Sequence, residues 1–178
     1  MPLILRRLWP AVEQRHNAAM SLQSVQTFIA QHAPDIAILQ TTEPTATVAE
    51  AARVHGVEPA QIAKTLSLWL NDEVILLVMG GDCRLDNRRF KAHFGGKARM
   101  LDAEEVLHWT SHPVGGVCPF GLPGPLKVFA DVSLRRFAEV LPAAGSVDTA
   151  LRIAPEYLAQ LVQAEWVDVA QQVQQATA

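Results

Sequence analysis

The sequence predicts an α+β fold with one domain, built on a mixed, mainly antiparallel sheet. Strand and helix patterns mix along the chain without the regular strand–helix–strand alternation of a parallel sheet. The chain has 178 residues, 49% of them hydrophobic and 19% charged, which is the size and composition of one globular domain. No internal repeat or linker divides it.

Apolar spacing and turn residues predict the elements of the first half. Apolar residues spaced three and four apart over 22–29 predict a helix that ends at Pro34. Thr47 and Glu50 form a capping box, which opens a helix that ends at Gly56. The remaining expectations are a strand at 36–41, a short helix from Pro59 to about Ala63, and a hairpin of strands beginning at Leu66 and at Val74.

In the second half, two acidic caps start helices. Asp86 precedes a helix through Phe94, and Asp102 with Glu105 opens a helix that reaches Trp109. The other expected elements are strands at 98–101, 127–131, 139–143 and 151–153, a helical turn at 133–136, and a helix opened by Pro155.

The domain is expected to span residues 20–170. Residues 1–19 are predicted to form an N-terminal extension, with a helical arm packed on the domain as the alternative. Residues 171–178 are predicted to form a Gln/Ala-rich C-terminal tail.

Charge and cysteine usage exclude several classes of function. The formal net charge is −3, so there is no global basic field that would attract nucleic acid or a membrane. Cys83 and Cys118 suggest neither a disulfide framework nor zinc spacing, and we expect no metal site and no cofactor. Because no secretory signal is evident and the longest apolar run, 74–79, is too short to span a bilayer, we expect a cytoplasmic protein with no membrane partner.

The stretch from His112 to Pro125 is the most unusual in composition. It holds four of the ten glycines and four of the eleven prolines. This mixture excludes a helix or a central strand and predicts a shaped, semi-rigid loop. Such a loop is either a ligand-binding wall or a plain connection between strands.

Lys64 and a basic stretch are candidates for binding phosphate. Lys64 lies in an apolar segment, where it either binds an anion or lays its stem over the core. Between Arg84 and Arg99 the only acid is Asp86, so this stretch is either a phosphate-binding surface or a solvated helix face. Its basic residues are Arg84, Arg88, Arg89, Lys91, Lys97 and Arg99.

Cys118 is a candidate nucleophile, with His108 or His112 as its base. Against this interpretation, Pro119 removes an amide beside the nucleophile and no acidic residue is placed to orient the base. We therefore expect Cys118 to line a pocket.

Taken together and in this order, several stretches resemble the YbaK/EbsC-type aminoacyl-tRNA deacylases, which also occur as an editing domain inserted in some prolyl-tRNA synthetases. The resemblance covers roughly residues 21–170. The matching stretches are Thr47-Val48-Ala49-Glu50-Ala51-Ala52 with Gly56-Val57, Gln61-Ile62-Ala63-Lys64-Thr65-Leu66, Gly80-Gly81-Asp82-Cys83-Arg84-Leu85-Asp86, Gly115-Gly116-Val117-Cys118-Pro119-Phe120-Gly121, Asp131, Ala144-Gly145-Ser146, and Ile153-Ala154-Pro155-Glu156-Tyr157-Leu158.

This resemblance implies a barrel-like sheet surrounded by helices, and hydrolysis of the ester that joins a mischarged amino acid to tRNA. It implies that Lys64 is the catalytic residue, that no protein nucleophile is used, and that the tRNA acceptor end is the partner, with prolyl-tRNA synthetase as a further possible partner. The residues expected to bind substrate are Gly115, Gly116, Val117, Cys118, Pro119, Phe120, Gly121, Thr47, Asp82, Gly145 and Ser146. The residues expected to contact tRNA are Arg84, Arg88, Arg89 and Lys91.

The predicted function is therefore a trans-acting deacylase, with tRNA(Pro) carrying cysteine, alanine or a similar small amino acid as its substrate. Small residues at the position of Cys118 tune the amino acid accepted in this family, so the sequence leaves the amino acid open. Two alternatives remain: a non-catalytic module that binds nucleotide or RNA ends in the same pocket, and a thiol hydrolase acting through Cys118.

Overall fold

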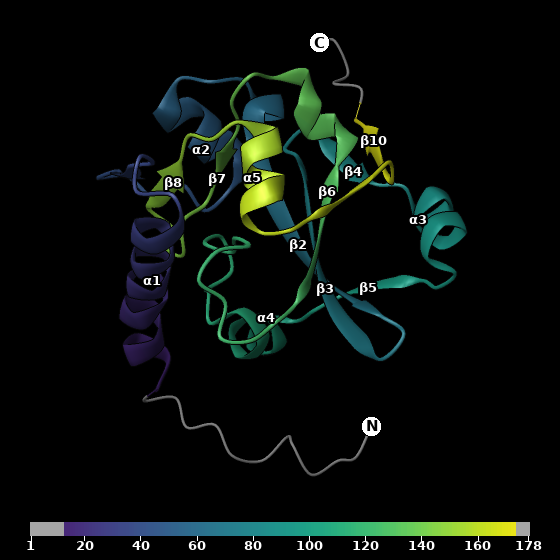
Figure 1. Cartoon of the computed structure of the whole chain (residues 1–178), viewed down its shortest axis with the longest axis horizontal. Coiled ribbons are helices and arrows are strands. Elements are labelled where there is room, and N and C mark those ends of the chain that lie inside the picture. The colour runs from purple at the N-terminus through teal and green to yellow at the C-terminus, as the bar shows by residue number, and fades with distance from the viewer. Residues whose placement is uncertain (1–12, 174–178) are drawn as a thin grey trace.

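The computed structural model describes residues 13–173 and shows an α+β architecture (Figure 1). The helices are α1 (Glu13–His32), α2 (Val48–His55), α3 (Asn87–Phe94), α4 (Ala103–Thr110) and α5 (Pro155–Leu161), with 3-10 turns η2 (Pro59–Gln61) and η3 (Val132–Arg136). The strands are β1 (Ile38–Gln40), β2 (Ile62–Leu70), β3 (Glu73–Gly80), β4 (Cys83–Leu85), β5 (Ala98–Met100), β6 (Lys127–Asp131), β7 (Leu141–Pro142), β8 (Thr149–Leu151), β9 (Glu165–Val167) and β10 (Ala170–Gln172).

The largest sheet has six strands, in the order β5-β2-β3-β6-β9 with β7 also paired to β2. The β2–β3 and β2–β5 pairs are antiparallel, whereas β3–β6, β6–β9 and β2–β7 are parallel. Two further antiparallel pairs, β1–β8 and β4–β10, form separate small sheets. The mixed sheet is therefore confirmed, but parallel pairs outnumber antiparallel ones in the largest sheet.

The expected barrel-like closure is not confirmed. Within residues 13–173, the ladder of the largest sheet ends at β5 on one side and at β9 on the other, and no pairing joins these two edges. The parallel strands β6 and β9 extend the sheet outward beyond β3. These pairings link segments far apart in the chain, so the local sequence pattern carried no sign of them.

The central strand β3 is covered on both faces. Leu76 and Val78 belong to a core shared with α1 and α5, while Leu77 and Met79 belong to a second core shared with α3. Figure 1 shows α1 and α3 on opposite sides of the molecule. Burial on both faces explains why 74–79 is a continuous apolar run, with none of the alternation of a half-exposed strand.

Local signals placed the helix ends well. Both capping boxes form, with Thr47 and Asp102 as N-caps, and Gly56 takes the left-handed conformation after α2. The expected helix from Pro59 to about Ala63 is only a 3-10 turn that ends at Gln61, because β2 begins at Ile62 and pairs with β3 from Ala63 to Leu70. Lys64 therefore lies inside β2 and not at a seam between a helix and a strand.

Two features of the structure differ from the sequence predictions. The short strands β4, β9 and β10 were not expected, and β10 extends from Ala170 to Gln172, across the predicted start of the tail at residue 171. Helix α1 begins at Glu13 and passes through the predicted boundary at residue 19, while residues 1–12 lie outside the described part of the chain.

Along residues 13–173, no helix combines the length and hydropathy needed to cross a membrane.

Candidate active site

A cavity of about 280 Å³ opens where one edge of β2 has no partner strand. On this edge β7 pairs with β2 only at Ile62 and Ala63, and β5 pairs with it only from Leu68 onward. The amide of Leu101 donates to the carbonyl of Ser67 at 3.1 Å. Because alternate residues of a strand direct their backbone groups to the same edge, the N–H and C=O of Thr65 also face this gap.

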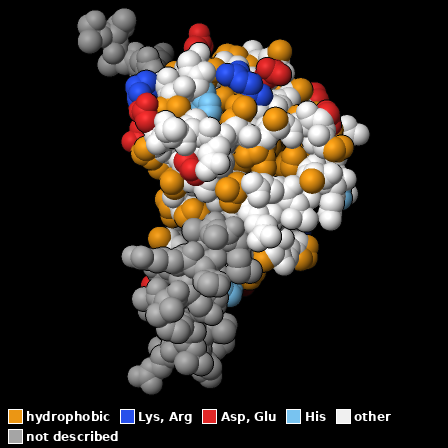
Figure 2. Space-filling view, turned by 90° about the vertical axis from the view of Figure 1, so that its left-hand side faces the viewer, with side chains coloured by type: hydrophobic (Ala, Val, Ile, Leu, Met, Phe, Trp, Pro, Cys, Tyr) orange, Lys and Arg blue, Asp and Glu red, His pale blue; other side chains and the backbone are white. Residues whose placement is uncertain are grey.

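The cavity walls come from four parts of the chain around this gap. One wall is formed by the loop before α2 and the first turns of that helix, and another by α4 and residues 114–117. The segments around β7 and β8 close a third side. Seen from the side on which α1, α2 and β8 lie, the middle of the surface is mostly hydrophobic or uncharged and charged side chains gather in its upper part (Figure 2).

Two glycines dock the Gly/Pro-rich loop against neighbouring backbone. Gly115 has φ +90°, and a Cβ there would lie 2.9 Å from the Cβ of Ala46. A Cβ on Gly116 would lie 2.8 Å from the Cα of Ser146, and the Gly116 carbonyl accepts from the Gly145 amide at 3.1 Å. Of the predicted loop residues, Gly115 and Val117 line the cavity, while Gly116 lies behind them and holds the loop in place.

The rest of the predicted loop lies in the core. Cys118, Pro119 and Phe120 are buried and do not line the cavity, and Phe120 contacts Phe28 of α1 with 6.0 Å between ring centroids. Gly121 has φ +60° and packs against the backbone of α1. These residues support the wall from behind.

Cys118 and His112 form a buried pair. The Sγ of Cys118 lies 3.7 Å from Nδ1 of His112, and neither residue is exposed. Burial raises the pKa of the Cys118 thiol to about 12 and lowers the pKa of His112 to about 4. Neither group carries charge near neutral pH, so the arrangement opposes a thiolate nucleophile.

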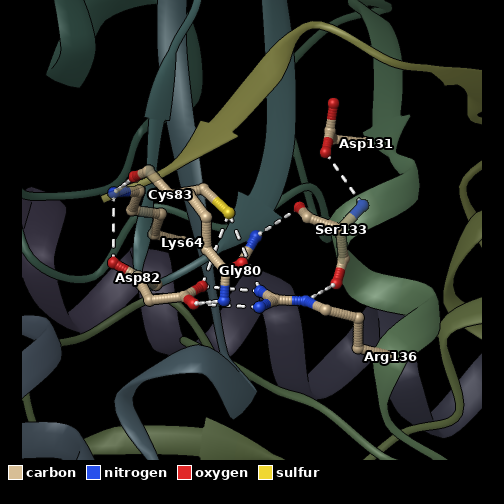
Figure 3. A network of polar contacts seen from close by, with 9 residues as sticks. Lys64, Gly80, Asp82, Cys83, Asp131, Ser133 and Arg136 are labelled. Carbon is tan, nitrogen blue, oxygen red and sulfur yellow. Dashed lines mark hydrogen bonds and ion pairs between the residues drawn. The ribbon is translucent and has the colours of Figure 1, made fainter. Parts of the chain in front are cut away.

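Lys64 lies at the gap in β2, with its ammonium held by backbone carbonyls (Figure 3). Its Nζ donates to the carbonyl of Gly81 at 3.3 Å and to that of Cys83. Burial lowers the pKa of Lys64, while the nearby Cys83 and Asp82 oppose this shift. The side chain is half-buried, so a positive charge is presented at the edge of a cavity whose other lining side chains are mostly apolar.

Asp82 does not line the cavity but secures the turn that holds Lys64. Its carboxylate accepts from Arg136 at 2.6 and 2.9 Å and from Gln172 at 2.9 Å. The Arg136 guanidinium holds the pKa of Asp82 well below its usual range. Arg136 in turn donates to the Ser133 carbonyl at 2.9 Å, and the Ser133 hydroxyl accepts from the Gly80 amide at 3.0 Å (Figure 3).

Thr47, Gly145 and Ser146, which were predicted to bind substrate, also form hydrogen bonds within the protein. Thr47 lines the cavity and caps α2, accepting from the Glu50 amide at 3.2 Å. Ser146 lies outside the cavity wall, 2.8 Å from the hydroxyl of Thr149, which does line it. The Gly145 carbonyl accepts from the Ser21 hydroxyl of α1 at 2.6 Å.

The four predicted tRNA contacts lie outside the cavity wall. Arg84 is on β4 and the others on α3, on the opposite side of the molecule from α2 and β8 (Figure 1). None of the four lines the cavity. All four residues are exposed, and Arg89 pairs with Asp168 at 2.7 Å.

Sequence reasoning missed several residues of this site. The hydroxyls of Thr65 and Ser67 and Nε2 of His55 are buried without a hydrogen-bond partner, and all three residues line the cavity. Alternating polar residues inside the apolar segment 62–70 were the available signal for the two hydroxyls. Met100 and Val114, 55% and 62% exposed, are large apolar side chains that also line the cavity.

Within residues 13–173 no group of three or more His, Cys, Asp or Glu side chains could hold a metal ion.

Comparison with known proteins places this cavity in context. Residues 42–161 match the aminoacyl-tRNA editing domain family. The uncharacterised protein YwhH of Bacillus subtilis is 43% identical over 152 residues, which cover 84% of this chain and 97% of that protein. The proline–tRNA ligase of Citrifermentans bemidjiense is 31% identical over 59% of this chain, and the match spans 18% of the ligase.

Solved structures show the same architecture. The crystal structure of a candidate trans-editing enzyme for prolyl tRNA synthetase has a TM-score of 0.79 and 30% identity, covering 85% of this chain and 97% of that one. The crystal structure of the hypothetical protein APE2540 has a TM-score of 0.77 and 33% identity, covering 83% of this chain and 99% of that one.

Proposed function

The chain belongs to the aminoacyl-tRNA editing domain family, and from this premise we propose that it is a trans-acting deacylase for mischarged tRNA(Pro). The bond cleaved is the ester between the amino acid and the terminal ribose. Cysteine, alanine or a similar small amino acid is the proposed cargo. The observation that carries the proposal is the cavity at the open edge of β2, with Lys64 at its margin.

The size of the cavity suits a small amino acid. Its volume of about 280 Å³ lies below the roughly 300–1,000 Å³ of sites for drug-sized ligands. Most of its lining side chains are apolar or small, including Val106, Val117 and Ala150. An aminoacyl group fits such a space, while the nucleotide that carries it remains outside.

The margin of the cavity offers two kinds of contact to an RNA end. The Lys64 ammonium provides a positive charge for a phosphate or for the developing oxyanion of the ester. Met100 and Val114 provide exposed apolar surface that a nucleobase can cover. Both contacts together favour an aminoacylated nucleotide over a free amino acid.

The proposed chemistry uses no covalent intermediate with the protein. A water molecule, or a hydroxyl or other group of the substrate, attacks the ester carbonyl, and the ribose oxygen leaves and takes a proton. The Lys64 ammonium and the free backbone N–H of Thr65 stabilise the oxyanion, and one such donor contributes about 2.7–4 kcal/mol in a known hydrolase. Thr47, Gly115 and Val117 shape the space around the aminoacyl group.

The proposal extends to partners and location. The basic residues Arg84, Arg88, Arg89 and Lys91 are proposed to contact tRNA phosphates, with prolyl-tRNA synthetase as an assisting partner. Because the net charge is −3, any intrinsic attraction to tRNA comes from this local surface and not from the whole protein. The expected location is the cytoplasm, where tRNA is charged.

A panel of charged tRNAs tests this function. Purified protein is incubated with tRNA(Pro) carrying cysteine, alanine, serine or proline, and release of the amino acid is followed over time. Faster release of at least one small non-cognate amino acid, with prolyl-tRNA(Pro) left intact, is the expected result. Binding of the charged tRNA without release would instead favour a non-catalytic module that binds RNA ends.

A further inference from the structure

We propose that Ser67, assisted by Thr65, makes this cavity selective for a small amino acid whose side chain carries a hydroxyl or a thiol. The inference rests on the proposed deacylase function and specifies its substrate class. It starts from the two hydroxyls on β2 that have no hydrogen-bond partner.

These hydroxyls are unusual in their burial. Ser67 is only 3% exposed and its Oγ has no partner, and the Thr65 Oγ1 is likewise buried and unpaired. Five buried side-chain polar atoms within residues 13–173 lack a partner, and three of them belong to residues that line this cavity. Buried polar groups in folded proteins are nearly always hydrogen-bonded, so these hydroxyls have free hydrogen-bonding capacity for polar atoms of a ligand that enters the cavity.

The position of the hydroxyls on β2 separates them from Lys64. Side chains alternate between the two faces of a strand, so Thr65 and Ser67 share one face and Lys64 lies on the other. Trp69, on the same face as Ser67, packs edge-on against Trp109 of α4 with 5.9 Å between ring centroids. The two hydroxyls therefore belong to the wall covered by α4, and Lys64 belongs to the opposite wall.

This separation divides the substrate between the two walls. The charged wall suits the ester and the phosphate, which carry or develop negative charge. The α4 wall includes the apolar side chains of Val106 and Val117, and the hydroxyls of Thr65 and Ser67 are the polar side-chain groups that β2 contributes to this wall. A side chain with one hydroxyl or thiol satisfies such a hydroxyl, whereas an apolar side chain of equal size leaves it buried and unpaired.

Serine and 2-aminobutyrate form the matched pair that tests selectivity. Both side chains have two heavy atoms, and they differ only in hydroxyl against methyl. Wild-type kcat/KM for deacylation of seryl-tRNA(Pro) is expected to exceed that for 2-aminobutyryl-tRNA(Pro) by about tenfold, the size of one neutral hydrogen bond. Ser67→Ala is expected to reduce this ratio to within about twofold, and Ser67→Cys to keep part of it.

Thr27→Ala is the control variant. It removes a threonine hydroxyl from the exposed surface of α1 and is expected to leave the ratio unchanged. Equal wild-type rates for the two esters, or a ratio that survives in Ser67→Ala, would overturn the inference. Melting temperatures of all variants show whether a lost ratio comes from a lost fold.

A binding measurement separates the inference from the proposed function. Adenosine carrying serine or 2-aminobutyrate through a 3′-amide is a stable analogue of the charged tRNA end. A roughly tenfold lower Kd for the seryl analogue, abolished by Ser67→Ala, is expected even if no ester is hydrolysed. That combination would refute the deacylase and retain the selectivity. Equal Kd values for the two analogues would refute the selectivity whatever the result of the hydrolysis assay.

Discussion

Lys64 owes its position to bonds that the rest of the chain supplies. Its ammonium is held by the carbonyl of Gly81, on the turn between β3 and β4, and by that of Cys83, the first residue of β4. That turn is secured by the Asp82–Arg136 pair, in which the Asp82 side chain is 14% exposed and that of Arg136 32%. A partly buried, bidentate pair of this kind restrains geometry better than a surface pair does.

Arg136 is therefore predicted to be a positioning residue. In Arg136→Met the turn loses its bidentate anchor, and kcat for deacylation is expected to fall about tenfold, the cost of about 1.4 kcal/mol in transition-state stabilisation, while KM changes little. Steady-state kinetics on the preferred charged tRNA measure kcat and KM separately.

Arg135→Met is the matched control. Arg135 is the neighbouring residue and also pairs with a carboxylate, Glu156 at 2.6 Å, but on the exposed surface. Kinetics close to wild type are expected for it. Equal losses in both variants would show that Arg136 has no special link to the site.

The sequence pointed to some residues at and around the cavity and missed others. Lys64 could be named because it stands alone in an apolar segment, but Arg136 could not, since its contact with Asp82 joins residues 54 positions apart. Cys118 was expected to line the pocket and is buried behind it, because Pro119 and Phe120 turn that part of the loop into the core. The assigned roles of these residues stay predictions.

Among the elements, the loop from His112 to Gly121 forms part of one wall of the cavity. It has no regular secondary structure and is held by close backbone contacts at its glycines. Gly116 meets the backbone around Ser146, which cannot give way as a flexible side chain can. Its lack of a side chain is therefore a packing requirement.

Gly116→Ala is predicted to displace this loop. The added Cβ would lie 2.8 Å from the Cα of Ser146, so either the loop or the 144–149 turn must shift. Deacylation is expected to fall at least tenfold, and melting temperature to fall by several degrees, consistent with about 1–3 kcal/mol for overpacking. Kinetics and thermal unfolding measure the two effects.

Gly124→Ala provides the control within the same Gly/Pro-rich stretch. A Cβ on Gly124 would meet no atom within 4 Å, and its φ is not positive. Activity and melting temperature close to wild type are expected. A comparable loss there would mean that the stretch is sensitive to any substitution and that the contact of Gly116 is not the cause.

At the scale of elements, short sequence motifs predicted the helix caps and turns whose hydrogen bonds join residues close together in the chain. The capping boxes at Thr47 and Asp102 and the hairpin around Asn71-Asp72 form as expected, because their hydrogen bonds lie within a few residues. The three-residue strands β4, β9 and β10 exist only through pairing with distant segments. The gap in β2 has the same origin, since it depends on where β5 and β7 begin and end.

At the scale of the whole molecule, His112 links stability to pH. It is unexposed, and burial lowers its pKa to about 4. The unfolded chain binds a proton near pH 6.5 and the folded chain does not, so stability is predicted to fall as pH drops from about 6.5 to about 4. The loss is up to about 3 kcal/mol, obtained from the difference of these pKa values.

Urea unfolding at a series of pH values tests this. His112→Asn keeps an acceptor for the amide of Cys118, 3.3 Å from Nδ1 in the wild type, and is expected to flatten the curve between pH 6.5 and 4. His93→Asn, a substitution on the exposed surface of α3, serves as the control. An unchanged slope in His112→Asn would contradict the prediction.

The placement of the basic surface leads to a separate prediction about tRNA binding. Arg88 and Lys91 are exposed on α3, which lies on the opposite side of the molecule from α2 and β8, two of the elements that line the cavity (Figure 1). If they contact phosphates, the double variant Arg88→Gln/Lys91→Gln raises KM without lowering kcat. The slope of log K against log salt becomes shallower by about 0.9 for each lost contact with duplex RNA, by analogy with DNA.

Lys127→Gln is the control for charge alone. Lys127 lies at the start of β6, outside the basic surface, and pairs with Glu73 at 2.8 Å. Its removal is expected to leave the salt dependence unchanged. Identical effects of the two substitutions would indicate that only net charge matters.

The most direct test of the account is the single-turnover rate of ester hydrolysis in Lys64→Ala. Wild type and variant are compared on the same mischarged tRNA(Pro), with matching circular dichroism and melting curves as proof that β2 and its sheet persist. The account predicts that hydrolysis by the variant drops by at least a hundredfold, the size expected for loss of one oxyanion donor. A folded Lys64→Ala protein that hydrolyses the ester at the wild-type rate would contradict it.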